Sequence, residues 1–320
     1  MSRDLRDDFS REDVSHDVLS RGDVPSSGRD LSPSRNPSAD RRSTGAPQRT
    51  WSPADRLHLP RTPGRRPVTL DRQRFMLRGS ESELLATVGV FRAIPLRDLK
   101  PYADNARPNE RSSFDADVRS LRDQRLLEMH TIIINGRPES VAVVTLRGRD
   151  LIEHALAPRS SPLAVRAQRF DAGSVKLRDL AHDAQLYRLF QTERERLETE
   201  GSTVTRVVLG NVLQADYYRY VHAEHLAGVD PVRARRAFAA EQNLSFAGER
   251  LHLPDVRVEY ETADGRSEYR DLELATEHYS RGKLSGKVGA GFRVYRAAGA
   301  RGDHRRGSAP SHPHRLESIA

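Results

Sequence analysis

The sequence predicts a mixed fold of the α+β or α/β class, with two ordered parts between two disordered tails. Residues 1–78 and 299–320 contain almost no periodic apolar residues. Residues 79–157 have the pattern of three helices, a β-hairpin and a further helix, and residues 175–298 that of helices around a small mixed sheet. The segment 158–174 is interpreted as the linker between them.

The bulk composition agrees with a partly unfolded chain. Its 320 residues suffice for two modest domains, but only 36% are hydrophobic and the mean hydropathy is −0.70. The lack of cysteine excludes disulfides, zinc–thiolate sites and thiol nucleophiles. No apolar run approaches the roughly 20 residues of a membrane span, and the N-terminus lacks the apolar core of a signal peptide. We therefore expect a cytoplasmic protein with no membrane partner.

The charge of the chain favours a nucleic-acid partner. The net charge is +8 and the sequence pI is about 10.0, which is typical of proteins that bind phosphate backbones. Only four of the basic residues are lysines: Lys100, Lys176, Lys283 and Lys287. Roughly +5 of the excess lies before residue 79, so the charge indicates a basic tail more than a basic domain.

The N-terminal tail is rich in Arg, Asp, Ser and Pro and has too few apolar side chains to offset the entropy of ordering. It includes Trp51, the only tryptophan of the chain. We interpret Trp51 as a solvated aromatic, with a docking motif as the alternative. The segment after residue 298 has a similar composition and is expected to be a tail as well.

Order is expected to begin near residue 79. Leu84, Leu85, Val88 and Phe91 keep helical spacing. The preceding Ser80, with Glu83 three residues later, predicts a capping box. Pro95 ends this helix, and a short second one is expected over 96–102. The third helix follows, with Phe114, Val118, Leu121 and Leu126 on one face.

A hairpin and a last helix complete the first ordered part. MHTIIINGRPESVAVVTL contains two β-rich runs joined through Asn135 and Gly136, a strong hairpin signal for which we expect a loop longer than two residues. RGRDLIEHAL is predicted to be helical. The strand ends in Thr145-Leu146-Arg147-Gly148.

This order of elements, together with the turn after the last strand, resembles the winged helix-turn-helix of bacterial regulators. In such a module the third helix enters the major groove, and the wing reaches a neighbouring groove or phosphates. The resemblance implies double-stranded DNA as a partner. It nominates as DNA-binding residues Arg111, Ser112, Ser113, Arg119, Arg122 and Arg137. Two alternatives stay open: a salt-bridged surface helix, because Asp115, Asp117 and Asp123 share it, or a protein–protein module.

The second ordered part is expected to hold a long helix from Leu177, a strand near Val204–Val208, two helices and then a pair of strands. In LHLPDVRVEYETADGRSEYRDLELAT the two strands are hinged at 263–265. Asp255 heads the first strand, and Glu273 lies in the second. SRGKLSGKVGAG and a last strand, FRVYRA, follow.

This order, with its acidic residues, resembles the core of the PD-(D/E)XK nuclease superfamily. The resemblance implies that Asp255 and Glu273 are catalytic residues that hold Mg²⁺, because hard carboxylates suit this ion. The lysine expected two residues after the second acid is absent, and Ala275 stands there. Lys283 or Lys287, from the following helix, would then supply the ammonium group.

The body of the chain, from about Ser80 to Arg296, also resembles replication-relaxation proteins of bacterial mobile elements. The matching stretches are HDAQLYRLF from His182, Pro254-Asp255, Asp271-Leu272-Glu273, and Gly291-Phe292 to Tyr295. The resemblance implies a role in replication, relaxation or transfer of a plasmid or integrative element. It also implies relaxase or replication proteins as further partners.

Three functions follow in order of preference. The first is a DNA-binding accessory protein with a degenerate nuclease-like platform. The second is a Mg²⁺-dependent nuclease. The third is a winged-helix transcriptional regulator with a C-terminal partner or dimerisation domain. Ala275 favours the first and third, whereas the intact acids Asp255 and Glu273 keep the second open. If a site exists, the two acids share one sheet face, roughly 4–6 Å apart.

Overall fold

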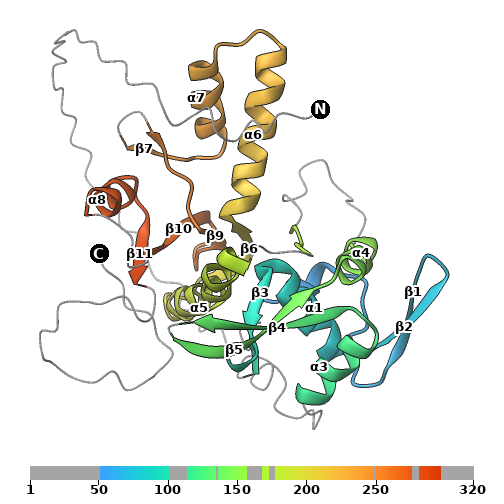
Figure 1. The fold of residues 1–320 in the computed structure, drawn as a ribbon. Coiled ribbons are helices and arrows are strands. Elements are labelled where there is room, and N and C mark those ends of the chain that lie inside the picture. The colour runs from blue at the N-terminus through green and yellow to red at the C-terminus, as the bar shows by residue number, and fades with distance from the viewer. Residues whose placement is uncertain are drawn as a thin grey trace, which may run out of the picture. The chain divides into compact units, whose positions relative to one another are not determined.

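A computed structural model describes residues 51–100, 114–134, 136–156, 168–172, 177–247, 250–275 and 281–296, without the side chains of 177, 178, 247, 250, 281 and 283. The predictions for the segments 1–50 and 297–320 and for Arg111, Ser112 and Ser113 lie outside the described residues. The fold is a mixed α+β arrangement with several small sheets (Figure 1).

Residues 51–78 correct the expected extent of the N-terminal tail. They form the 3-10 helix η1 (Pro53–Arg56) and the hairpin of β1 (Arg66–Leu70) and β2 (Gln73–Leu77). Five of their side chains are buried in the main core: Ala54, Leu57, Leu59, Phe75 and Leu77. Trp51 packs edge-on against Phe190, with ring centroids 5.3 Å apart, and is therefore not a solvated aromatic. The apolar residues of this segment are too sparse among the arginines to give a periodic signal. They nevertheless pack into the core that the later helices and strands form.

Helix α1 (Gly79–Phe91) begins two residues earlier than its sequence signal suggests, because its N-cap is Arg78 and not Ser80. The backbone N–H of Arg78 donates to the Glu81 carboxylate at 2.9 Å, so the cap does not involve Ser80. Glu83 instead accepts a hydrogen bond from the Ser52 hydroxyl. Arg92, at φ 64°, ends the helix. The short strand β3 (Ala93–Pro95) and a helical segment over 96–100 follow.

The first sheet has the strand order β3-β5-β4. Strands β4 (Leu127–Ile134) and β5 (Arg137–Val144) pair antiparallel as far as Ile134 opposite Arg137. Only residues 135 and 136 join them, so the loop is shorter than expected, and Gly136 adopts φ 75° as such a tight turn requires. Helix α3 (Phe114–Asp123) packs against α1 and buries the predicted apolar face.

Helix α4 (Leu146–His154) explains the turn motif after β5. The Thr145 hydroxyl accepts the N–H of Gly148 at 3.0 Å and donates to the carbonyl of Arg125 at 2.7 Å. A Cβ on Gly148 would lie 2.3 Å from the Leu126 carbonyl oxygen. Thr145 therefore caps the helix, and Gly148 has no side chain that would keep α4 away from the start of β4.

The second sheet has the strand order β11-β10-β9-β6. Its first three strands in the sequence are β6 (Thr203–Leu209), β9 (Val256–Glu261) and β10 (Ser267–Ala275), which pair antiparallel. After β10 the chain passes through α8 (Arg281–Gly289) and returns as β11 (Arg293–Arg296), parallel to β10. Between β6 and β9 lie α6 (Gly210–Leu226), α7 (Pro231–Glu241), β7 (Phe246–Ala247) and β8 (Arg250–Leu251).

The long helix α5 (Leu177–Thr199) packs on both sheets. Near its start, Leu180 and Ala184 belong to an apolar cluster with β4 and β5. Further along, Tyr187 and Phe190 enter the main core, where Phe91 lies 5.1 Å from both rings. The two ordered parts therefore share one hydrophobic core.

The predicted linker 158–174 is partly a packed segment. The side-chain amide of Gln168 donates to the Val207 carbonyl at 2.8 Å and accepts the Val207 N–H at 3.1 Å, so it pairs with β6 as a strand would. Phe170 is buried. The N–H of Asp171 donates to the Gly89 carbonyl at 2.7 Å. Among the described helices none is both long and apolar enough to cross a bilayer.

Candidate functional site: an acidic sheet face

Asp255 and Glu273 meet on the second sheet. Val256 is paired with Leu272, and the N–H of Asp255 donates to the Leu272 carbonyl at 3.0 Å. The next register position therefore sets Asp255 opposite Glu273, and residues directly opposite each other point to the same face of an antiparallel pair. Both acids of the predicted pair thus belong to one face of the sheet.

Asp255 is held by the backbone and by a histidine. Its Oδ2 accepts the N–H of Leu274 at 2.7 Å, and the same oxygen lies 3.5 Å from Nε2 of His182, near the start of α5. The other ring nitrogen of His182 is 3.6 Å from Asp183. Burial lowers the pKa of His182, but the hydrogen bonds and charges of Asp183 and Asp255 outweigh it and raise the pKa to about 10. His182 is therefore an imidazolium at neutral pH.

Glu273 is buried and paired with a lysine. Only 1% of the residue is exposed, and its Oε2 lies 3.0 Å from Nζ of Lys287 in α8. Lys287 also donates to the Leu253 carbonyl at 2.7 Å, which fixes the ammonium beside the Pro254-Asp255 turn. An ammonium group from α8 thus stands beside the second acid. The Lys283 side chain lies outside the described part of the chain.

A third acid of this face, Asp271, is also neutralised. Asp271 accepts two hydrogen bonds from Arg257, both at 2.7 Å, and both residues are buried. Arg257 also donates to the Gln242 carbonyl and stacks 4.2 Å from the ring centre of Tyr269. Sequence reasoning missed this pair, although alternation in two antiparallel strands puts residues 257 and 271 at facing positions.

A hollow of about 260 Å³ opens beside Asp255 and His182. The first turn of α6 forms part of its wall. There the N–H of Gly210 donates to the Asp255 carbonyl at 2.7 Å. A Cβ on Gly210 would lie 2.3 Å from the Pro254 carbonyl oxygen, so a glycine is required for this approach. Arg92 lines the hollow and pairs with Asp183 at 3.0 Å.

This donor set does not fit a divalent ion as it is arranged. Carboxylate oxygens are the ligands that Mg²⁺ prefers, but Asp255 contacts His182 and Glu273 contacts Lys287. Over the described ranges no three His, Cys, Asp or Glu residues are grouped as a metal ion requires. His182 and Lys287 occupy contacts of the two carboxylates, and no metal-dependent step follows from this geometry.

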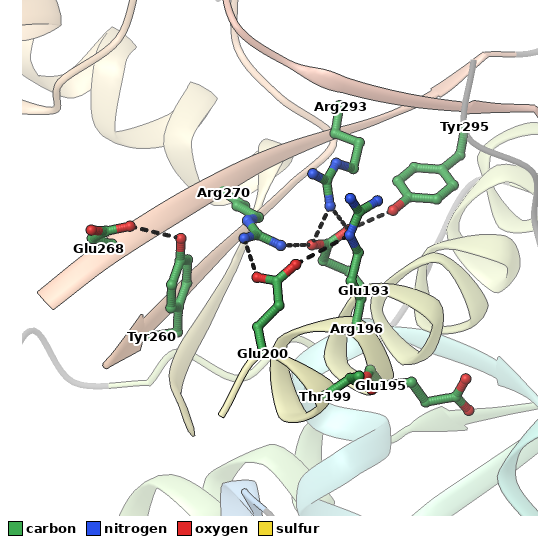
Figure 2. Close-up of polar contacts among 10 residues, drawn as sticks. All are labelled: Glu193, Glu195, Arg196, Thr199, Glu200, Tyr260, Glu268, Arg270, Arg293 and Tyr295. Carbon is green, nitrogen blue, oxygen red and sulfur yellow. Dashed lines mark hydrogen bonds and ion pairs between the residues drawn. The ribbon is translucent and has the colours of Figure 1, made fainter. Parts of the chain in front are cut away.

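A separate polar cluster joins α5 to the sheet. Figure 2 shows Glu193 between Arg270, Arg293 and Tyr295. Glu193 is fully buried and accepts hydrogen bonds from Arg270 at 2.6 Å, from Arg293 at 2.8 and 3.0 Å, and from the Tyr295 hydroxyl. Burial and the bond to Glu193 raise the pKa of Tyr295. Arg270 also binds Glu200 at 2.6 Å. Every charge is compensated, so the cluster is structural.

The arginines predicted to contact DNA are on the surface where they are described. Arg119 and Arg122 are exposed on α3, and Arg137 is exposed at the β4–β5 turn. Within the part of the chain that the structure describes, none of the three forms an ion pair. Asp117, by contrast, is buried and pairs with Arg78. This acid therefore does not neutralise the outer face of α3.

Comparisons with protein-family models, with curated proteins and with solved structures found no match to this chain.

Proposed function

We propose that the chain is a DNA-binding protein that contacts duplex DNA through residues 79–154, acting as a winged helix. The observation that carries the proposal is that Arg119, Arg122 and Arg137 are exposed and form no ion pair with the residues that the structure describes. The element order from α1 to β5 and the strand order β3-β5-β4 agree with such a module. Arginine suits this task because its planar fork donates two parallel hydrogen bonds to a phosphate or a guanine edge.

The second sheet is proposed to be a nuclease-like platform without cleavage activity. A meander of three antiparallel strands, a helix and a fourth parallel strand supports the superfamily resemblance. The pairing of Asp255 with His182 and of Asp271 with Arg257 argues against catalysis. The resemblance to replication-relaxation proteins suggests that the bound DNA belongs to a plasmid or integrative element.

Fluorescence anisotropy with a labelled duplex tests the DNA-binding proposal. The full chain is expected to bind at low salt. The slope of log affinity against log salt concentration should become shallower by about 0.9 for each phosphate contact removed. We expect Arg119→Ala/Arg122→Ala to weaken binding and flatten the slope. Arg233→Ala/Arg236→Ala removes two exposed arginines from α7 and is the matched control. No binding by wild type at low salt would overturn the proposal.

A second candidate is a Mg²⁺-dependent nuclease, and one observation favours it. Lys287 stands 3.0 Å from Glu273, where an ammonium group could compensate for Ala275. Incubation with supercoiled plasmid, with and without Mg²⁺ or Mn²⁺, separates the candidates. The platform proposal expects no cleavage. Metal-dependent nicking that disappears in Asp255→Ala, Glu273→Ala and Lys287→Ala would establish the nuclease instead, whereas equal nicking by wild type and variants would indicate a contaminant.

A further inference from the structure

The β1–β2 hairpin carries a concentration of positive charge that no predicted function accounts for. Residues 65–78 include five arginines and one acid, Asp71. Two of the arginines are used internally, since Arg65 pairs with Glu81 and Arg78 with Asp117. The other three are exposed and form no ion pair with any described residue: Arg66, Arg72 and Arg74.

The hairpin has a core face and a solvent face. Phe75 is paired with Val68, and together they point into the main core. Thr69 and Arg74 are also paired, one position along, so they share the opposite face and are exposed. The buried face fixes the hairpin on the molecule. The outer face presents a hydroxyl and a guanidinium, both of which donate hydrogen bonds to phosphate oxygens.

The tip of the hairpin projects a second arginine. Asp71 and Arg72 both adopt positive φ, 47° and 65°, as the two-residue turn that matches strand twist requires. Glycine or asparagine would adopt this conformation more easily than arginine. The turn nevertheless carries a guanidinium at its exposed end, and strained backbone of this kind is found more often at functional positions.

The hairpin is fixed beside the helix proposed to read DNA. Gln124, directly after α3, accepts the N–H of Met76 at 2.7 Å and donates to its carbonyl at 3.1 Å. Pro67 pairs opposite Met76 and has no N–H of its own. The outer edge of β2 is therefore joined to the C-terminal end of α3. Figure 1 shows the hairpin, in blue, next to α3.

We propose that the β1–β2 hairpin is a second DNA-contacting arm, which binds the phosphate backbone through Arg72 and Arg74 while α3 contacts the groove. The inference rests on the proposed DNA binding and extends it to a surface outside the winged-helix module. Charge complementarity identifies the partner: unpaired guanidinium groups and a hydroxyl suit a phosphate backbone and carry no base specificity.

The salt dependence of DNA affinity tests the arm. In the full chain, Arg72→Ala/Arg74→Ala is expected to flatten the logarithmic salt slope by about 1.8, that is, about 0.9 for each lost contact, equally for unrelated duplex sequences. Arg233→Ala/Arg236→Ala should keep the wild-type slope. Both pairs are exposed, and unchanged melting temperatures would verify that folding is intact.

Two outcomes would contradict the proposals. If the hairpin variant keeps the wild-type slope and affinity while Arg119→Ala/Arg122→Ala weakens binding, the proposed arm alone is overturned. Failure of wild type to bind would overturn both proposals.

A crosslink gives an independent measurement. Because the chain has no cysteine, Gln73→Cys provides a unique thiol at the hairpin tip for a photoactivatable crosslinker. We expect it to crosslink to bound duplex. Ala263→Cys, at the exposed β9–β10 turn, is the matched control and should not. Crosslinking from position 263 but not from position 73 would contradict the arm.

Discussion

At the scale of single residues, the charges of Asp255 and Glu273 on the second sheet are each compensated by a cationic side chain. Asp255 faces the imidazolium of His182, and Glu273 faces the ammonium of Lys287. A divalent ion would have to displace two cations that the chain itself supplies. Each of these cations comes from a helix, α5 or α8, whereas Glu273 lies in β10 and Asp255 directly precedes β9. Removing Lys287 would take an ion-pair partner from the buried Glu273, which is costly.

The pKa of His182 predicts a pH dependence of stability. Its folded-state pKa of about 10 lies above the ordinary histidine pKa of 6.5, so the protonated ring stabilises the fold. That contribution is fully present below pH 6.5 and is lost as the pH rises through about 10. His182→Asn should therefore lose stability relative to wild type at pH 6, with a smaller difference at pH 10. Urea unfolding at both pH values measures this, and a constant difference would contradict it.

At the scale of elements, α5 connects the two sheets and the Glu193 cluster fixes it to the second one. Arg270 comes from β10, and Arg293 and Tyr295 come from β11. All three converge on a carboxylate with no exposed surface (Figure 2). A buried carboxylate is stable only with such partners, so this cluster sets the position of α5 along the sheet, and with it the position of His182.

Loss of the Glu193 carboxylate should destabilise the protein. Glu193→Ala leaves Arg270 and Arg293 without their shared partner, and we expect a loss of about 3 kcal/mol, typical of breaking a buried pair. Glu195→Ala, an exposed position in the same helix, is the control and should lie within about 0.5 kcal/mol of wild type. Urea titration measures both. Equal stability of the two variants would mean that apolar packing alone fixes α5.

At the scale of the whole molecule, residues 51–78 belong to the folded body. The described part of the chain begins at residue 51, and the hairpin, Leu57 and Leu59 complete the core around α1. A body that began at Gly79 would expose this surface. The folded body therefore includes residues that composition had assigned to the tail.

Limited trypsin digestion should report this boundary. We expect a resistant fragment that begins near Arg49, although arginines are frequent up to residue 78. A recombinant chain from residue 49 should melt at the temperature of the full chain, whereas one from residue 79 should lose cooperative unfolding, because it lacks Phe75 and Leu77. A resistant fragment beginning near residue 79 would contradict the structure and restore the longer tail.

The sequence by itself determined the local elements. Period-3.6 spacing indicated α1, α3 and α5, an Asn-Gly turn indicated the β4–β5 hairpin, and alternation indicated β9 and β10. These signals are readable because they depend on neighbours within a few residues. Their order was sufficient to propose a winged helix and a nuclease-like sheet.

Only the tertiary structure decided how distant residues combine. The contacts of Asp255 with His182 and of Arg78 with Asp117 span 73 and 39 positions, and no local pattern encodes them. The sparse apolar residues before Gly79 became part of the core for the same reason. Burial and ion pairing depend on what the rest of the chain brings close, and a pattern along the sequence does not contain that information.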